Sequence, residues 1–600
     1  MKPPALALLA AFVAASPVLA AEDGAPTIKG DIPAGLRAMI ERALDGVGGS
    51  SPSRFEARRR ARDGADKATA VLRSEGYYAQ DVQADVVEDG VNSQPVLTVT
   101  PGPPFVVAEP QVLWAAPEPE LAARQAAATA MALDPGEPGR AADVLAAEGR
   151  VVAAIQSQGY ADAAAQPREV IVDHADHTLR PTFNIASGPK VLLGPVQLTA
   201  KGRTNPAWVA GLAPWRVGEV YLPDRVAELE RRLRETSVYD QVSVALRPAD
   251  QGLVDNTRPI LVTLADRAPR TIELGAGFST SQGAGVDGRL LMYNRLHRAD
   301  TLTFTARLAE IEQKLDGEVS LPQWRGPQQT LKMGGGIFNE DTDAYRQTGL
   351  GARFDVTKRY GRAVYQISYR TLGASIDFAR VRDRISEGGE TFGVARNLVT
   401  VAALGALALD RSDDPLNPKR GWRVEARTEP TVIFGQTRTQ FLKTQVQGSA
   451  YLPLGARADT VLAGRLKVGA IVGGTIPGVP ASRRFFAGGG GSVRGYAYQA
   501  IGPRLEDNTP LGGVSLAEAS FEVRQRVTER WSGVAFIDVG GVGGSNRVGI
   551  PSREDFSAGV GLGVRYDLGF GPIRADIAFP LDKRAGDPAF QLYLSIGQSF

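Results

Sequence analysis

The sequence predicts α+β repeats followed by an all-β transmembrane barrel of about 16 antiparallel strands. Three observations lead to this fold class. Up to about Pro269, helical and strand patterns are mixed, whereas apolar and polar residues alternate with a period of two from there onward. The chain begins with an export signal, and its last strand finishes on Phe600, which is typical of bacterial outer-membrane barrels. Together these observations favour a lipid-facing barrel over a soluble sandwich.

Residues 1–21 are predicted to be a secretory signal peptide. Lys2 precedes an apolar run from Ala5 to Val13, and small residues continue to Ala20 and Ala21, after one of which we expect cleavage. No later segment offers the ~20 unbroken apolar residues that a spanning helix requires. The mature chain is therefore expected to be either soluble outside the inner membrane or embedded as a barrel.

Charge and cysteine content argue against two classes of function. Lys and Arg total 68 and Asp and Glu 66, a balance of +2 that gives no electrostatic case for a nucleic-acid partner. The sequence contains no cysteine, which excludes a disulfide framework and a thiolate metal site. His174 and His177, in "DHADH", favour a solvated turn over a metal site. We expect no cofactor, no metal and no enzyme site.

Three modules of about 80 residues each are predicted in the N-terminal part, at 22–104, 105–190 and 191–269. Each has a helix, a tyrosine-bearing turn, a strand and a Pro/Gly break, and the turns carry Tyr77, Tyr160 and Tyr239. The third helix, "PDRVAELERRLRE", begins at Pro223, which suits a first helical turn. The arginine-rich "RFEARRRAR" of the first module is interpreted as a solvated helix face.

Residues 270–600 are predicted to form the barrel, with about 20 residues for each strand and its turn. In "GVGLGVRYD", Val560, Leu562 and Val564 share one face of the strand, and glycines and Arg565 share the other. The same alternation predicts that the first strand, from Thr271, directs Ile272 and Leu274 outward to lipid.

The segment "RRFFAGGGGSVRGYAYQAIGPR", from Arg483 to Arg504, has no strand or helix pattern. It does not match a phosphate-binding loop, because no Lys-Ser/Thr follows its glycines. We predict a loop folded back into the barrel lumen with Arg494 at its tip. A buried arginine needs an acceptor, and alternation in "VAFIDVGG" turns Asp538 inward. An Arg494–Asp538 pair is therefore predicted to pin the loop.

These motifs resemble the Omp85 superfamily. In that family, the arginine of a V-R-G-F/Y loop motif contacts an inward aspartate of an F-x-D-x-G strand. The matching residues of the loop motif and of the strand are Val493, Arg494, Gly495 and Tyr496, and Phe536, Asp538 and Gly540. The three modules resemble POTRA domains. Their number and the loop sequence are similar to the A subunit of the translocation and assembly module.

The resemblance implies a protein that inserts or translocates autotransporter-type barrels into the outer membrane. Its partners would be outer-membrane lipid, unfolded clients and a periplasmic B-subunit-like protein that spans from the inner membrane. The residues suggest a barrel seam between the first and last strands, weakened by Gly275, Gly277 and Gly597. A weak seam can part and template an incoming strand.

Two other functions fit parts of the sequence. A two-partner-type secretion pore would pass a polypeptide through the lumen, and it would need the Arg494 loop to leave. A solute porin would leave the three repeats without a role. Planar-bilayer conductance separates these alternatives, because a large steady conductance favours a pore.

Overall fold

The computed structural model describes residues 26–45, 53–89, 92–249, 256–280, 282–361, 367–387, 390–435, 438–455, 457–544, 551–568, 572–584 and 586–596. The predicted signal peptide (1–21), Gly597 and Phe600 lie outside these residues. The described chain forms two compact units, and the division passes through the third module. The first unit holds the chain up to Pro195, which includes the first two modules, with segments 215–226 and 246–260. The second holds segments 196–214 and 227–245 and the chain from Leu261 onward.

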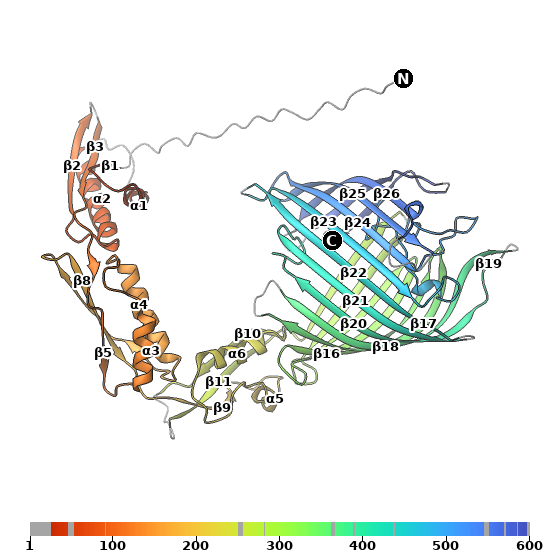
Figure 1. The fold of residues 1–600 in the computed structure, drawn as a ribbon, viewed down its shortest axis with the longest axis horizontal. Helices are drawn as coiled ribbons and strands as arrows, with labels where there is room; N and C mark the ends of the chain where they lie inside the picture. The colour runs from red at the N-terminus through yellow and green to blue at the C-terminus, as the bar shows by residue number, and fades with distance from the viewer. Residues whose placement is uncertain are drawn as a thin grey trace. The chain divides into compact units, whose positions relative to one another are not determined.

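The first module packs two helices on a three-stranded sheet of order β1-β3-β2 (Figure 1). Its elements are β1 (Thr27–Lys29), α1 (Ala34–Leu44), α2 (Arg54–Ser74), β2 (Asp81–Asp89) and β3 (Asn92–Thr100). Ser53 caps α2 by accepting a hydrogen bond from the Glu56 N–H at 3.3 Å. Leu36, Ile40, Leu72 and Leu97 form the core, so a helix face and a sheet face bury one another.

The second module places four short strands around the central β8. Its elements are β4 (Val106–Val107), β5 (Gln111–Ala115), α3 (Leu121–Met131), α4 (Ala141–Gln156), β6 (Ala164–Ala165), β7 (Glu169–Asp173) and β8 (Thr178–Ala186). Strands β4 and β5 run parallel to β8, and β6 and β7 run antiparallel to it. The buried face of α4, with Val144, Val151 and Ile155, packs in the core of this module.

The third module has a three-stranded sheet of order β10-β11-β9. Its elements are β9 (Leu192–Leu198), α5 (Pro206–Ala210), α6 (Pro223–Arg234), β10 (Tyr239–Leu246) and β11 (Thr257–Asp266). Helix α6 starts at Pro223, as its sequence predicts. Among the described residues, none of the helices combines the length and the apolar character needed to cross a membrane.

A left-handed residue recurs after the second helix of each module. Gly76, Gly159 and Ser237 have φ of 91°, 102° and 59°. They align Val238, not Tyr239, with Tyr77 and Tyr160, so the tyrosine spacing of the third repeat is offset by one residue. Backbone N–H groups at or near the end of each module donate to these turns: Phe105 to Gly76 O, Val191 to Gly159 O and Arg267 to Val238 O, at 2.9, 2.9 and 3.1 Å.

Within the described residues, sixteen antiparallel strands close into a barrel, which confirms the predicted fold class. Figure 1 shows these strands in green to blue. They are β12 (Arg270–Ser279), β13 (Gly283–Tyr293), β14 (Thr301–Ala309), β15 (Glu312–Pro322), β16 (Gln329–Asp341), β17 (Tyr345–Tyr360), β18 (Ser368–Glu387), β20 (Arg396–Asp410), β21 (Gly421–Phe434), β22 (Thr439–Leu454), β23 (Thr460–Val472), β24 (Ser515–Arg526), β25 (Trp531–Gly543), β26 (Phe556–Asp567), β27 (Pro572–Pro580) and β28 (Gln591–Ile596). The short β19 (Glu390–Phe392) pairs with the end of β18, which also pairs directly with β20.

The barrel has an apolar outside and a polar inside. Leu274 on β12 is 83% exposed and Leu562 on β26 is 63% exposed, whereas Asp538 and Glu522 are fully buried in the interior. A soluble sandwich would bury its apolar face and expose its charges. The reversed arrangement is that of a barrel whose outer wall faces lipid.

Candidate functional site: the lumen loop and the barrel seam

The segment between β23 and β24 folds into the barrel and has a structure of its own. It contains a short 3₁₀ helix, Ala481–Arg483, and a bridge in which Phe485 and Gly513 exchange backbone hydrogen bonds of 2.8 and 2.9 Å. Arg484 ties the turns together by donating to the carbonyls of Val479 and Leu511, each at 2.8 Å. The segment is therefore an ordered plug against the inner wall.

Arg494 is the centre of the contacts between this loop and the wall. Its Nε and Nη2 donate to the two carboxylate oxygens of Asp538 at 2.6 and 3.0 Å, and its backbone N–H donates to the same group at 3.1 Å. Its Nη1 lies 2.8 Å from Glu522 and 3.2 Å from Asp576. Its guanidinium also lies over the Phe536 ring, 3.4 Å from the ring centre. Arg494 is only 2% exposed, so its charge is met entirely by protein groups.

The strand pattern explains why these acids converge. Ile537 on β25 faces outward and is 41% exposed, so its neighbour Asp538 must face the lumen. Ser520 pairs with Asp538 across β24 and β25, and Gly559 pairs with Asp538 across β25 and β26. The three acids come from β24, β25 and β27 of the inner wall, and β26 lies between the last two.

Glycines let the loop approach the wall closely. Gly495 has φ of 101°, and a Cβ there would lie 2.8 Å from the backbone of Phe579. A Cβ on Gly540 would lie 2.6 Å from the Val493 side chain, and one on Gly559 would overlap the carbonyl oxygen of Arg494. Of the predicted strand motif, Phe536 and Asp538 therefore contact Arg494, while Gly540 makes room for Val493.

The four-glycine run has two functions in the structure. Gly488 and Gly489 have φ of 105° and 99°, a conformation that favours glycine. A Cβ on Gly490 would lie 2.8 Å from the Tyr593 ring. The run therefore turns the chain sharply and then passes it close to the last strand.

Two tyrosines attach the loop to the C-terminal wall. Tyr496 is fully buried, and its hydroxyl donates to Ala558 O at 3.0 Å. The hydroxyl of Tyr593, on β28, accepts from the Gly495 N–H at 3.2 Å and donates to Tyr496 O at 3.3 Å. The motif residues Val493 to Tyr496 thus reach the strand that closes the barrel.

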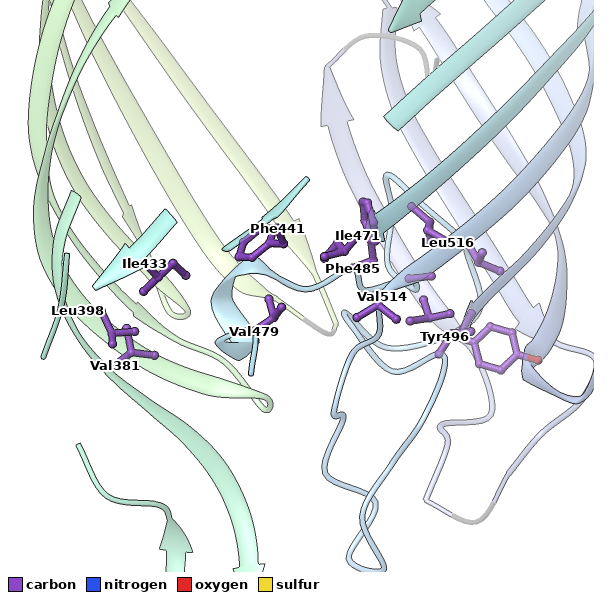
Figure 2. Close-up of a cluster of buried hydrophobic side chains, with 14 residues drawn as sticks. Val381, Leu398, Ile433, Phe441, Ile471, Val479, Phe485, Tyr496, Val514 and Leu516 are labelled. Atoms are coloured by element: carbon purple, nitrogen blue, oxygen red, sulfur yellow. The ribbon is translucent and has the colours of Figure 1, made fainter. Parts of the chain in front are cut away.

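An apolar cluster holds the other part of the loop. Figure 2 shows Val479 and Phe485 of the loop beside side chains from the inner wall. The wall contributes Val381, Leu398, Ile433, Phe441, Ile471 and Leu516. A packed apolar cluster inside a polar lumen stabilises the loop in addition to the ion pairs.

The seam joins the first and last strands of the barrel. Strand β12 pairs with β13 along its whole length, from Arg270 to Ser279. With β28 it forms only two residue pairs within the described chain, Phe278 with Leu594 and Ser279 with Tyr593. Gly275 leaves room for the Asp287 side chain, and a Cβ on Gly277 would meet only Leu594 O, at 3.8 Å. The predicted seam residue Gly597 and the terminal Phe600 lie outside the described residues.

Sequence reasoning missed two of the acids that bind Arg494. Glu522 and Asp576 stand on the inward faces of "FEVRQR" and "IRADIAF", so alternation places them in the lumen. Alternation does not predict that both acids contact one arginine, because this depends on how strands β24 to β27 lie side by side in the wall. The described residues contain no group of three or more potential metal-binding side chains. His174 and His177 pack against Phe105, each with its ring centre 5.3 Å from that ring's centre.

Comparison with known proteins identifies the barrel. The family model described as "Omp85 superfamily domain" matches residues 294–600, just over half of the chain. The chain belongs to the Omp85 superfamily. As a member with this barrel, it lies in the outer membrane, with its POTRA modules in the periplasm.

Its curated relatives include outer membrane protein assembly factors BamA. The factor from Neorickettsia risticii (strain Illinois) is 22% identical over 421 residues, which cover 68% of this chain and 55% of the relative. The factor from Neisseria meningitidis serogroup B is 20% identical over 468 residues, covering 70% and 58%. The chain spans about half the length of these relatives.

A solved structure shows the same fold. The crystal structure of BamA from Haemophilus ducreyi lacking POTRA domains 1–3 superimposes with a TM-score of 0.66 at 16% identity. The match covers 82% of this Omp85 chain and all of the other.

Proposed function

We propose that this protein assembles autotransporter-type β-barrel proteins in the outer membrane by opening its seam to an incoming strand. Its POTRA modules would bind periplasmic clients or a B-subunit-like partner that reaches from the inner membrane. The observation that carries the proposal is the seam itself. Strand β12 carries Gly275 and Gly277, which weaken a strand, and it meets β28 at Phe278 with Leu594 and at Ser279 with Tyr593.

Unpaired strand edges explain how such a seam would act. When the seam parts, the backbone groups of β12 that face β28, as at Phe278 and Ser279, lose their partners. Inside a bilayer each unsatisfied backbone group costs several kcal/mol. A client strand that pairs with this edge satisfies those groups, so the seam favours strand addition from the periplasm and release sideways into lipid.

The lumen loop supports sideways release over transport through the lumen. The alternative function, a two-partner-type secretion pore, requires this loop to leave. Leaving would separate Arg494 from three carboxylates and break the apolar cluster around Phe485. Separating one partner of a buried ion pair typically costs about 3–5 kcal/mol, so a closed lumen is the stable state.

A reversible lock on the seam tests the proposal. The chain has no cysteine, so Phe278→Cys with Leu594→Cys introduces one lipid-facing pair across the seam. We expect the oxidised variant to lose client assembly in proteoliposomes and the reduced variant to regain it. The matched control is Val286→Cys with Leu308→Cys, which face lipid and pair across β13 and β14. This control should assemble clients in both redox states.

Normal client assembly by the locked seam would contradict the proposal. Planar-bilayer recordings of the same variants distinguish lateral opening from the alternative function, a secretion pore. A secretion pore would show a large steady conductance that the seam lock leaves unchanged, whereas a laterally opening barrel with the loop in place would conduct little.

A further inference from the structure

A polar cavity of about 240 Å³ lies on the lumen side of the seam. Its walls are the end of β12, the glycine run of the loop, the inner faces of β13 and β14, and residues of β27 and β28. Gly277, Gly490, Gly491, Arg574 and Tyr593 line it, so it joins the weak seam to the ordered loop. Nothing in the Arg494–Asp538 pairing uses this cavity.

Arg574 supplies the cavity with a buried positive charge. It is 7% exposed, and its Nε has no hydrogen-bond partner within the described residues. Its Nη2 makes one long contact, 3.4 Å, to Gly490 O. The nearest acid, Asp576, is 3.6 Å from its Nε. A guanidinium offers five donors, and a buried one with so few acceptors is costly.

Arg574 shares its acid with other arginines. Asp576 also pairs with Arg494 and Arg565, so three arginines share one carboxylate. Of these three, Arg574 lines the cavity, so its donors can meet a ligand there.

The opposite wall does not neutralise Arg574. Asp287 and Arg307 line the cavity from β13 and β14. Arg307 pairs with Glu312 at 3.0 Å, and among the described residues the ion pair of Arg574 is with Asp576, not with Asp287. The glycines add space, because a Cβ on Gly277 would have one neighbour at 3.8 Å and a Cβ on Gly491 would have none within 4 Å.

We infer that this cavity binds a carboxylate of the client strand and that Arg574 is its specificity-determining residue. The inference rests on the proposed function. A strand that adds to β12 in an opened seam takes the place of β28 at Phe278 and Ser279, which line the cavity, and so comes beside the loop and Arg574. An arginine pairs with a carboxylate through two parallel hydrogen bonds, which suits the free side of Arg574.

The charge distribution across the seam favours a polypeptide ligand over a lipid headgroup. On the outer, lipid side of the same strands lies a separate cavity of about 460 Å³ lined by Phe278, Leu562, Ile577 and Leu592. Acyl chains match that apolar surface. The polar cavity opens on the lumen side, where a client arrives from the periplasm.

The test uses the full-length protein in phosphatidylcholine nanodiscs and a synthetic peptide as the incoming strand. The peptide is QLYLSIGQSF, the sequence of residues 591–600, which has the alternation of a barrel strand. It is made with a free terminal carboxylate, with a terminal amide, and as the amide with Gln598→Glu. We expect the wild type to bind the free acid about tenfold more tightly than the amide, as one charge-assisted pair allows.

Variants assign this preference to Arg574. Arg574→Gln should bind acid and amide peptides equally, and Arg574→Lys should restore part of the preference, which also shows that the site folds. The matched control is Arg526→Gln, which removes an arginine of β24 that pairs with Asp459 outside the cavity. It should keep the full preference. Tight binding of the Glu-containing amide would assign the site to side-chain carboxylates, and weak binding would assign it to the chain terminus.

Three results would overturn the inference: equal affinity of the wild type for acid and amide, a preference that persists in Arg574→Gln, or no binding of any peptide. An Arg574-dependent loss of peptide binding in phosphatidylglycerol nanodiscs would reassign the cavity to a lipid headgroup. The proposed function is tested separately, by the cysteine lock across the seam. Equal binding of acid and amide peptides therefore removes the carboxylate site and leaves the lateral seam in place.

Discussion

The hydroxyl of Tyr593 on the last strand accepts a hydrogen bond from the N–H of Gly495 in the lumen loop at 3.2 Å. The ring of the same residue closely approaches Gly490, and its backbone belongs to one of the two seam pairs. The loop and the seam are therefore mechanically connected through a single side chain.

Tyr593→Phe is expected to loosen this connection. It removes the hydroxyl that bonds to Gly495 and Tyr496, at a cost of about 1–3 kcal/mol for two hydrogen bonds. The thermal unfolding midpoint of the barrel in detergent should fall, and hydrogen exchange of the loop should rise. Tyr566→Phe is the control, because within the described part of the chain its hydroxyl bonds to the exposed Arg530. Equal effects of the two substitutions would show that the loop connection is unimportant.

Asp538→Asn should free the tip of the loop. Arg494 would keep Glu522 and Asp576 but lose its bidentate partner, a loss on the order of 3 kcal/mol in local stability. Limited proteolysis should then cleave within residues 485–500, where the wild type resists. Asp459→Asn breaks an exposed pair with Arg526 and should leave the digestion pattern unchanged. An uncut loop in Asp538→Asn would contradict the pinning role.

Gly559→Ala should impair barrel closure. A methyl group at this position would overlap the carbonyl oxygen of Arg494. We expect the folded, heat-modifiable form to decrease on semi-native gels. Gly533→Ala, on the neighbouring β25, places its methyl group where nothing lies within 4 Å and should fold normally. A lower yield of the folded form for Gly533→Ala than for Gly559→Ala would exclude close packing at Gly559 as the cause.

The third module is expected to lose stability at alkaline pH because of the buried hydroxyl of Tyr239. Burial raises the pKa of its hydroxyl to about 12, although a hydrogen bond with Thr204 at 2.8 Å partly opposes the shift. The folded state holds this proton more tightly than the unfolded state, whose tyrosine pKa is about 10. Its contribution to stability is therefore complete below pH 10 and is lost as the pH rises towards 12.

Ultraviolet titration of the full chain checks this shift. The difference between wild type and Tyr239→Phe isolates one tyrosine, which should ionise near pH 12. The difference between wild type and Tyr566→Phe, which removes a tyrosine of the barrel, serves as the comparison. A difference spectrum centred at pH 10 would show that Tyr239 is solvated.

Alternation along strands predicted much of the site. It predicted that Asp538 faces inward because Ile537 faces lipid, and the need of a buried Arg494 for an acceptor paired the two. Glu522 and Asp576 were visible as inward acids, but their convergence on Arg494 depends on the register of β24 to β27 and on the path of the loop. No local pattern encodes such contacts.

Helical periodicity and turn residues predicted the modules with less accuracy. Pro223 marked the start of α6 correctly because proline suits the first turn. In the third repeat the aligned tyrosine was wrong by one position, because the left-handed residue there is Ser237 and not a glycine. A weak seam could not be predicted from the strands alone, since glycines in both strands fit a fully paired barrel as well.

The contacts of Arg494 have a consequence for how the barrel completes its own folding. They gather acids from β24, β25 and β27, and the adjoining glycine bonds to β28. A slip of one residue in any of these strands would turn its side chain from the lumen to lipid. The loop can dock only after all four strands have found their register, so its docking acts as a proofreading step for the C-terminal wall.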